Sequence, residues 1–340
     1  MMAPARRIER ITVVGAGSWG TTIANLLAGK GFAVELWARE PETARELTDR
    51  GVNSRYLPGI ALNSSLRAAT SLKDSVTSAD LVIFAIPAQS LRQVVRCAQP
   101  YIAEDVLIVN LAKGIEEGTC ARCSEIVLQE LKQRNPVAVL SGPNIAWEVV
   151  RGVPSKGVVA CSNYRYLALL QNLFSTPCFK VYENPDLAGT ELGGALKNVI
   201  AIMAGIGDGL GYGANTKSAV ITRGLQEMIR IGVVMGGHRE TFFGLSGIGD
   251  LMATALSEHS RNRRLGECLG NGASLAEAEA ALNGRVAEGI QTTRALLEIK
   301  TSFALDTPIV ETLHRVLFEG LPARDGYLAT WNSLDRFEGD

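Results

Sequence analysis

A single lysine stands inside a mostly apolar stretch, ELGGALKNVIAIMAGI, at residues 191–206. If the stretch is a helix, the face around Lys197 carries small or aliphatic neighbours: Gly193, Gly194, Ile200, Ala201 and Ala204. Each helical glycine costs about 1 kcal/mol against alanine, so this face is expected to admit a close approach, by a substrate in the catalytic interpretation. The alternative is a structural lysine that extends to water beside a close helix crossing.

A second segment, GLSGIGDLMATALSEHSRNRRLG at residues 244–266, begins with a glycine-rich turn. Asp250, Thr254 and Ser257 follow at positions i, i+4 and i+7, so they share one face of a helix. This stripe is either part of a site or a solvated face whose aspartate suits the positive end of the helix dipole.

The end of this segment places arginines where a helix is expected to begin. Ser260 is a predicted N-cap, and Arg261, Arg263 and Arg264 then fall in the first turn. Cations are electrostatically unfavourable at that end unless an anion neutralises them, so the pattern favours a phosphate site. Surface pairing with Glu258 or Glu267 is the alternative.

The N-terminal region carries a glycine motif, Gly15-x-Gly17-x-x-Gly20, between a predicted strand and a predicted helix. Its strand–turn–helix context favours dinucleotide binding over a turn without a ligand. Gly15 allows the tight turn, Gly17 lets the backbone approach a diphosphate, and Gly20 lets the helix pack on the strand. The diphosphate is expected at the helix N-terminus.

The end of the next strand is expected to select the cofactor. VELWARE places Arg39 there, and arginine favours the 2′-phosphate of NADP. Glu40 follows and can serve the ribose of NAD, so use of both cofactors stays open, as does a solvated surface role for Arg39.

Loops after three later strands add polar residues, since ligands of such sheets bind beyond the carboxyl ends of the strands. The candidates are Pro87, Gln89, Lys113, Gly142, Asn144 and Ala146. Lys113 would place a cation there, whereas Asn144 equally fits a helix N-cap.

Short apolar runs alternate with helical segments through the first half of the chain, which predicts a mostly parallel α/β sheet with right-handed crossovers. From about residue 189 only helical segments follow: 189–206, 216–236, 247–257, 261–269, 274–282, 287–300 and 307–319. We therefore expect a doubly wound Rossmann-type domain at residues 1–185 and an all-α domain at residues 186–340.

The charge balance, the length of the apolar runs and the cysteines limit which classes of function are expected. The 340 residues include 34 Lys+Arg against 35 Asp+Glu, which does not suggest a nucleic-acid partner. The longest apolar runs are too short for a membrane span, and MMAPARRIER does not fit a signal peptide, so a cytosolic protein is expected. The six scattered cysteines, including the pair Cys120 and Cys123, predict reduced thiols and no metal site.

These motifs together resemble the bacterial-type NAD(P)-dependent glycerol-3-phosphate dehydrogenases, in order and over nearly the whole chain. The matching blocks are GAGSWGTT, AKGIE, SGPN, ELGGALKNVIAIMAGIGDGLG, NTKSAVITRGLQEM, TFFGLSGIGDLMAT, SRNRRLG and VAEGIQTT. The resemblance implies a fold like the 6-phosphogluconate dehydrogenase group and reversible reduction of dihydroxyacetone phosphate to sn-glycerol 3-phosphate, which feeds phospholipid synthesis. It is compatible with a homodimer.

The resemblance also implies roles for individual residues. The catalytic group comprises Lys197 as general acid/base with Lys113, Asn198, Asp250 and Thr254. Substrate contacts fall on Lys113, Gly142, Asn144, Lys197, Asp250, Ser260, Arg261 and Asn262, although Asn144 stands where the family commonly has serine. Dinucleotide contacts fall on Gly15, Gly17, Ser18, Trp19, Gly20, Arg39, Lys113, Ala146, Arg261, Val286 and Glu288.

An embedded lysine suits this reduction, because negative charge develops on the carbonyl oxygen as the carbon is reduced. A free lysine, with a pKa of about 10.4, is a poor base near neutral pH. Burial and neighbouring cations are expected to lower the pKa of Lys197, while Asp250 favours its charged form. Two rivals stay open: a hydroxyacid or 6-phosphogluconate enzyme of the same fold, and a non-catalytic NADP(H) sensor.

Overall fold

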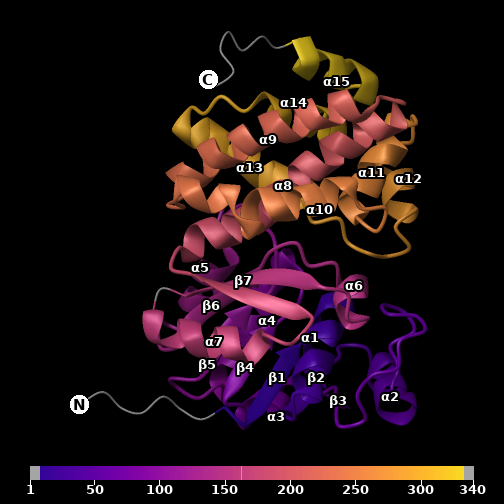
Figure 1. Ribbon diagram of the computed structural model, residues 1–340. Coiled ribbons are helices and arrows are strands. Elements are labelled where there is room, and N and C mark those ends of the chain that lie inside the picture. The colour runs from indigo at the N-terminus through magenta and orange to yellow at the C-terminus, as the bar shows by residue number, and fades with distance from the viewer. Residues whose placement is uncertain (1–7, 162, 333–340) are drawn as a thin grey trace. The chain divides into compact units, whose positions relative to one another are not determined.

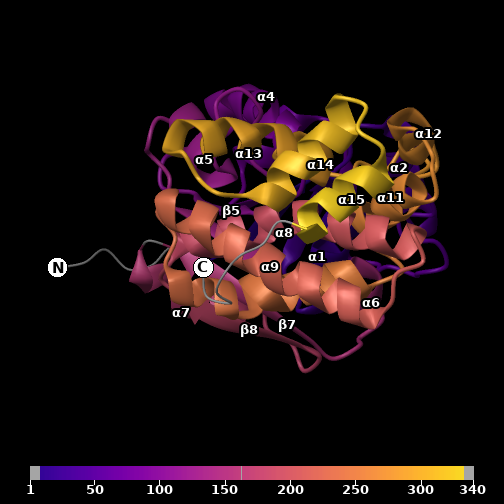
Figure 2. The same ribbon diagram turned by 90° about the horizontal axis from the view of Figure 1, so that it is seen from above.

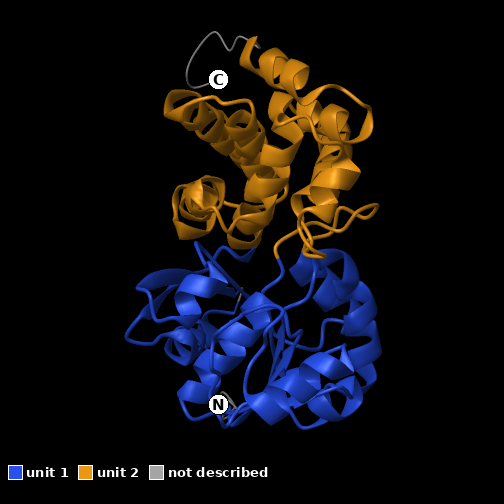
Figure 3. Ribbon diagram, turned by 90° about the vertical axis from the view of Figure 1, so that its right-hand side faces the viewer, with its two compact units in different colours: residues 1–112, 123–187 blue, residues 113–122, 188–340 orange. Residues whose placement is uncertain are grey.

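The computed structural model describes residues 8–161 and 163–332. Most of MMAPARRIER and the last eight residues of the C-terminal segment GYLATWNSLDRFEGD lie outside the described residues. The chain forms two compact units (Figures 1 and 3). Unit 1 comprises residues 1–112 and 123–187, and unit 2 comprises residues 113–122 and 188–340.

Unit 1 is built on one eight-stranded sheet. Its strands are β1 (Arg10–Val14), β2 (Ala33–Trp37), β3 (Arg67–Ala69), β4 (Leu81–Phe84), β5 (Leu107–Asn110), β6 (Val137–Ser141), β7 (Ser155–Cys161) and β8 (Phe179–Asn184). Their order is β3-β2-β1-β4-β5-β6-β7-β8, and each neighbouring pair is parallel except β6 with β7. The predicted doubly wound, mostly parallel sheet is therefore confirmed.

The helices of unit 1 connect these strands. They are α1 (Ser18–Gly29), α2 (Pro41–Arg50), α3 (Leu72–Thr77), α4 (Ala88–Ala98), α5 (Cys123–Glu130), α6 (Ala146–Val150) and α7 (Leu167–Phe174). The central strands are apolar and buried because layers cover both faces of such a sheet; Val13, Ile83 and Val109 are fully inaccessible. Strand order reverses between β1 and β4, which places the expected ligand crevice beyond their carboxyl ends.

From residue 188 to residue 332, unit 2 consists of helices and the loops that connect them, as predicted. Its helices are α8 (Leu187–Gly209), α9 (Ala214–Val234), α10 (Asp250–Leu256), α11 (Arg261–Gly270), α12 (Leu275–Ala280), α13 (Gly289–Phe303), α14 (Pro308–Phe318) and α15 (Ala323–Asn332). A π-helical turn, Leu245–Gly249, leads directly into α10. Helices α14 and α15 pack against one another (Figure 2).

Helix α8 is the centre of unit 2, since every residue from 189 to 207 is buried. A helix that is apolar around most of its circumference is a core helix rather than a surface helix. Lys197 is therefore held inside a packed core and is only 6% exposed. Within the described residues, none of the helices is both long enough and apolar enough to span a membrane.

Candidate active site

The glycine motif of unit 1 has the geometry that its sequence predicts. Gly15 has φ +120°, and a Cβ there would lie 2.5 Å from the Ala85 carbonyl oxygen. A Cβ on Gly20 would lie 2.0 Å from the Gly15 carbonyl oxygen, so only glycine lets α1 pack this closely on the turn. A Cβ on Gly17 would meet no atom within 4 Å, which leaves open space beside the backbone at the start of α1.

This helix N-terminus fits an anionic group. Helix α1 begins after Gly17 with no side-chain cap and has no acidic residue in its first turn. Helix N-termini carry partial positive charge and unsatisfied N–H groups that favour phosphate. The buried indole Nε1 of Trp19 has no hydrogen-bond partner among the described residues, so it can donate to a ligand at the motif. The residues present therefore fit a dinucleotide diphosphate.

Other predicted cofactor residues of unit 1 lie around this motif. Ser18 donates its hydroxyl to the Tyr56 carbonyl oxygen at 3.1 Å, and Ala146 accepts from Thr22 of α1 at 3.4 Å. Arg39 follows β2, and its 77% exposed side chain binds Glu40 through Nη2 at 2.8 Å. That hydrogen bond lowers the pKa of the Glu40 carboxyl. The guanidinium therefore remains accessible to a further anion.

Gly142 and Asn144 follow β6 in unit 1. Gly142 has φ +115°, and the Asn144 side-chain amide donates to the Lys156 carbonyl oxygen at 3.0 Å. The alternative N-cap role of Asn144 is wrong, because Ile145 occupies the cap position of α6. The buried Oδ1 of Asn144 has no hydrogen-bond partner among the described residues.

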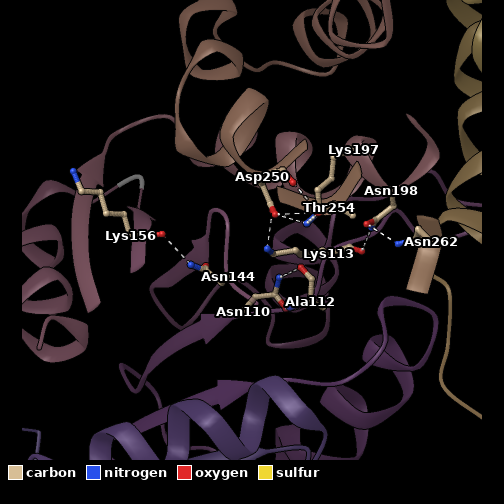
Figure 4. A network of polar contacts seen from close by, with 10 residues as sticks. All are labelled: Asn110, Ala112, Lys113, Asn144, Lys156, Lys197, Asn198, Asp250, Thr254 and Asn262. Atoms are coloured by element: carbon tan, nitrogen blue, oxygen red, sulfur yellow. Dashed lines mark hydrogen bonds and ion pairs between the residues drawn. The ribbon is translucent and has the colours of Figure 1, made fainter. Parts of the chain in front are cut away.

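The predicted catalytic residues of unit 2 form one network (Figure 4). The Lys197 ammonium contacts Oδ1 of Asp250 and donates to the Thr254 hydroxyl at 2.7 Å. Lys113 contacts the other carboxylate oxygen, Oδ2 of Asp250, at 2.7 Å. Asp250 is only 1% exposed, so the interpretation as a solvated face is wrong for this residue, although Asp250 does lie in the first turn of α10.

The electrostatics of this network suit proton transfer near neutral pH. Burial lowers the pKa of Lys197 to about 7, Asp250 opposes this shift, and the Lys113 cation adds to it. These are the directions that the sequence argument predicts. Two ammonium groups share one carboxylate, an arrangement that favours an anionic ligand.

Two asparagines extend the network through unit 2. The Asn198 amide donates to the Lys113 carbonyl oxygen at 3.3 Å, and its Oδ1 accepts from Asn262 at 2.9 Å. Oδ1 of Asn262 accepts from the backbone N–H of Gly289 at 3.1 Å. Asn262 therefore ties α8, α11 and α13 together, in addition to its predicted place beside a phosphate.

The three arginines at the start of α11, where a phosphate site is predicted, differ in their surroundings. Ser260 is the N-cap, accepting from the Arg263 backbone at 3.2 Å. Arg263 is not available to substrate, because its guanidinium binds Asp208 at 2.5 Å and Glu267 at 3.2 Å. The alternative of pairing with Glu267 is thus correct for Arg263. Arg264 is exposed.

Arg261 contacts Val286, a further residue with a predicted dinucleotide contact. Its Nη1 donates to the Val286 carbonyl oxygen at 3.1 Å, and Glu288 occupies the cap position of α13. Arg261 is itself exposed. Their contact with a dinucleotide stays a prediction.

The small residues of α8 serve helix packing. A Cβ on Gly193 would lie 2.4 Å from the Ser246 carbonyl oxygen, and one on Gly205 would lie 2.0 Å from that of Arg263. The expectation that Gly193 leaves room for substrate is therefore wrong. The close approach predicted from these glycines is made by the protein's own backbone, which brings the turn before Asp250 onto α8.

The two units define the class of protein. A doubly wound sheet with an anion-ready glycine turn, and a helical unit with a buried lysine, an aspartate and an arginine, are the parts of a two-unit NAD(P)-dependent dehydrogenase. A family model described as NAD-dependent glycerol-3-phosphate dehydrogenase N-terminus matches residues 10–167, and its C-terminal counterpart matches residues 186–327. The chain belongs to this NAD-dependent glycerol-3-phosphate dehydrogenase family.

Individual relatives agree over nearly the full length. A protein of Clostridium tetani named glycerol-3-phosphate dehydrogenase (NAD(P)+) is 43% identical and is matched over 93% of this chain and 90% of its own. One of the same name from Chlorobium phaeobacteroides is 47% identical over 94% and 96%. The crystal structure of glycerol-3-phosphate dehydrogenase from Coxiella burnetii superposes with a TM-score of 0.92 at 37% identity, covering 96% of this chain and 99% of that chain.

Proposed function

We propose that this chain reduces dihydroxyacetone phosphate reversibly to sn-glycerol 3-phosphate, with NADPH or NADH as the reductant. The observation that carries the proposal is the buried network in which Lys197 and Lys113 share Asp250. The nicotinamide, when bound, supplies the hydride for the carbonyl carbon. The dinucleotide diphosphate is assigned to the glycine motif of the sheet unit, and the acid/base chemistry to unit 2, which includes residues 113–122.

Lys197 is assigned the proton transfer. With a pKa of about 7 it holds a proton at slightly acid pH and releases it readily, so it can protonate the developing alkoxide during reduction and accept that proton during oxidation. Asp250 and Thr254 fix the ammonium in place through contacts that leave its third N–H direction for the substrate oxygen.

The phosphate of the substrate is assigned to the start of α11. Ser260 and Asn262 bracket Arg261, an exposed arginine of the first turn, and the dipole of α11 favours an anion there. The Lys113 ammonium, which contacts Oδ2 of Asp250, supplies a second positive charge for the anionic substrate. In the sheet unit, Gly15, Gly17, Ser18, Trp19 and Gly20 would hold the diphosphate, and Arg39 the adenosine 2′ position.

We infer a cytoplasmic enzyme that supplies the backbone of glycerophospholipids, with a homodimer as its assembly. These three statements rest on family membership, and sedimentation or light scattering of the purified protein tests the assembly.

One assay tests the function directly. Oxidation of NADPH, then NADH, is followed at 340 nm with dihydroxyacetone phosphate and with unphosphorylated dihydroxyacetone. We expect turnover with the phosphate ester only, and loss of about three or more orders of magnitude in kcat for a folded Lys197→Met variant. Tight NADPH binding without turnover of any phosphorylated ketone would instead favour a sensor.

A further inference from the structure

Residues 113–122, the Lys113 segment, lie in sequence between β5 and α5 of unit 1 but pack with unit 2 (Figure 3). Lys113 is the first residue of this segment, and its ammonium reaches Asp250 at 2.7 Å. Two residues further on, Ile115 is fully inaccessible within the hydrophobic core of unit 2. The placement of the Lys113 cation therefore depends on how this segment is held on the helical unit.

The two ends of the Lys113 segment pair with each other. Ile115 and Arg122 form an isolated antiparallel β-bridge. The Glu116 backbone N–H donates to the Ala121 carbonyl oxygen at 3.0 Å, and that of Cys120 donates to the Glu116 carbonyl oxygen at 3.0 Å. A movement of Arg122 is thus transmitted across the bridge to Ile115, close to Lys113.

Helix α8 holds both ends of the segment. At the first end, the Asn198 amide donates to the Lys113 carbonyl oxygen at 3.3 Å. At the other end, the Arg122 guanidinium pairs with the Glu191 carboxylate at 3.4 Å. Glu191 and Lys197 belong to the same helix, six residues apart.

The Arg122–Glu191 pair is buried, with side chains 15% and 1% exposed. The same segment carries a second ion pair, Glu117 with Arg294 at 3.1 Å, whose side chains are 39% and 44% exposed. Exposed pairs hold geometry weakly because water competes and screens, whereas a buried pair that loses one partner leaves an uncompensated charge. Of these two pairs, the buried one is the anchor.

We propose that the buried Arg122–Glu191 ion pair is a positioning device for catalysis, which fixes the Lys113 segment on α8 so that the Lys113 ammonium stays on Asp250 beside Lys197. Arg122 and Glu191 act through Lys113 and do not touch the substrate. This inference rests on the proposed function of the Lys197 network.

The device acts on the proton affinity of Lys197. The groups that face the Lys197 ammonium are the Asp250 carboxylate and Thr254 hydroxyl of α10 and the Lys113 cation of the segment. After burial, the Lys113 cation is a further cause that lowers the pKa of Lys197. When the segment loosens, the average distance between the two cations grows, and the pKa of Lys197 rises.

The test removes both charges of the pair, in the double variant Arg122→Gln/Glu191→Gln, so that net charge is unchanged. We expect kcat/KM for dihydroxyacetone phosphate to fall about 10- to 100-fold at neutral pH, as misplaced catalytic groups do. We also expect the alkaline limb of the pH profile for reduction, which reports the ionisation of Lys197, to move to higher pH. The matched control, Glu117→Gln/Arg294→Gln, removes the exposed pair of the same segment and should keep both the rate and the limb.

Epistasis with Lys113 separates positioning from a general structural role. In a Lys113→Met background this limb should already lie at higher pH. The substitutions Arg122→Gln and Glu191→Gln should then move it no further. A folded double variant whose limb coincides with that of the unsubstituted protein would overturn the proposal, as would a full additional displacement in the Lys113→Met background. Circular dichroism and thermal unfolding establish the folded state.

Glu191→Gln alone is the second variant, in case the double variant does not fold. It keeps an amide oxygen for Arg122 while removing one negative charge from unit 2. Loss of an anion by itself would lower the pKa of Lys197, so an upward limb supports the positioning role and an unchanged or lowered limb refutes it. Absence of turnover in the unsubstituted protein would refute the proposed function instead.

Discussion

Replacement of Asp250 by asparagine tests the assignment of Lys197 as the proton donor. The Asp250 carboxylate is the main group that keeps Lys197 charged against the effect of burial. Asparagine has nearly the same shape but no charge, so the pKa of Lys197 should fall further below about 7. Reduction needs the protonated lysine, so its activity is present below that pKa and lost above it.

The magnitude follows from the protonated fraction. With a pKa of about 7, about one Lys197 in ten is protonated at pH 8. An opposite charge at this range is worth about 1–3 pKa units, and a decrease of about 2 leaves about one in a thousand protonated at pH 8. The reductive kcat/KM should then fall about 100-fold at pH 8 but only about twofold at pH 5.

The assay is kcat/KM between pH 5 and 9 in both directions, since this parameter reports ionisation of the free enzyme. Oxidation needs the neutral lysine, so its acid limb should move to lower pH by the same amount as the alkaline limb of reduction. Thr254→Val, which removes a hydrogen bond at 2.7 Å but no charge, is the control and should largely keep the limb. A uniform loss at every pH, with limbs unmoved, would refute the role of Asp250 in setting this pKa.

Two further predictions concern the cofactor and the fold. Arg39→Asp should lower the ratio of kcat/KM for NADPH to that for NADH about tenfold or more, because a charged hydrogen bond to the 2′-phosphate is lost; Arg45→Asp, at a similarly exposed pair with Glu42, should leave the ratio unchanged. Gly266→Ala should destabilise the protein by about 1–3 kcal/mol in chemical denaturation, since its Cβ would lie 1.9 Å from the Ile202 carbonyl oxygen. Gly29→Ala, whose Cβ would approach nothing closer than 3.9 Å, should be neutral or stabilise the protein by up to about 1 kcal/mol, and equal midpoints for the two variants would contradict the packing argument.

Much of the sheet unit could be predicted because its signals are local. A strand, the turn at Gly15 and a helix are contiguous in sequence, and the parallel order follows from the alternation of apolar runs with helices. Strand β3 could not be predicted, since three partly exposed residues at the edge of the sheet carry no apolar run. Helix α15 could not be predicted either; it buries only Gly326 and Tyr327, so its apolar pattern is weak.

Much of the network around Lys197 could be predicted from residue types, whereas the use of individual residues could not. Arginines in the first turn of α11 look alike in sequence, and only the fold brings Asp208, 55 residues away, onto Arg263. The membership of residues 113–122 in unit 2 is equally invisible, because strand β5 and helix α5 on either side belong to unit 1. Both depend on contacts distant in sequence, which periodicity does not encode.

Glu191 shows what a charged residue inside an apolar sequence can predict and what it cannot. It lies in the same apolar helix as Lys197 and is even less exposed, at 3% against 6%, so the reasoning that singles out the lysine applies equally to the glutamate. A buried charge needs a partner, and for Lys197 the partner is Asp250, while for Glu191 it is Arg122. Because α8 is one continuous buried helix, the two ionic contacts share one support. The glycines Gly193 and Gly205 bring Ser246 and Arg263 onto the same helix, which fixes the turn before Asp250 and the start of α11 against it. A charge inside an apolar helix is thus evidence for a fixed point in the structure, and its chemical role is decided by what the fold brings to it.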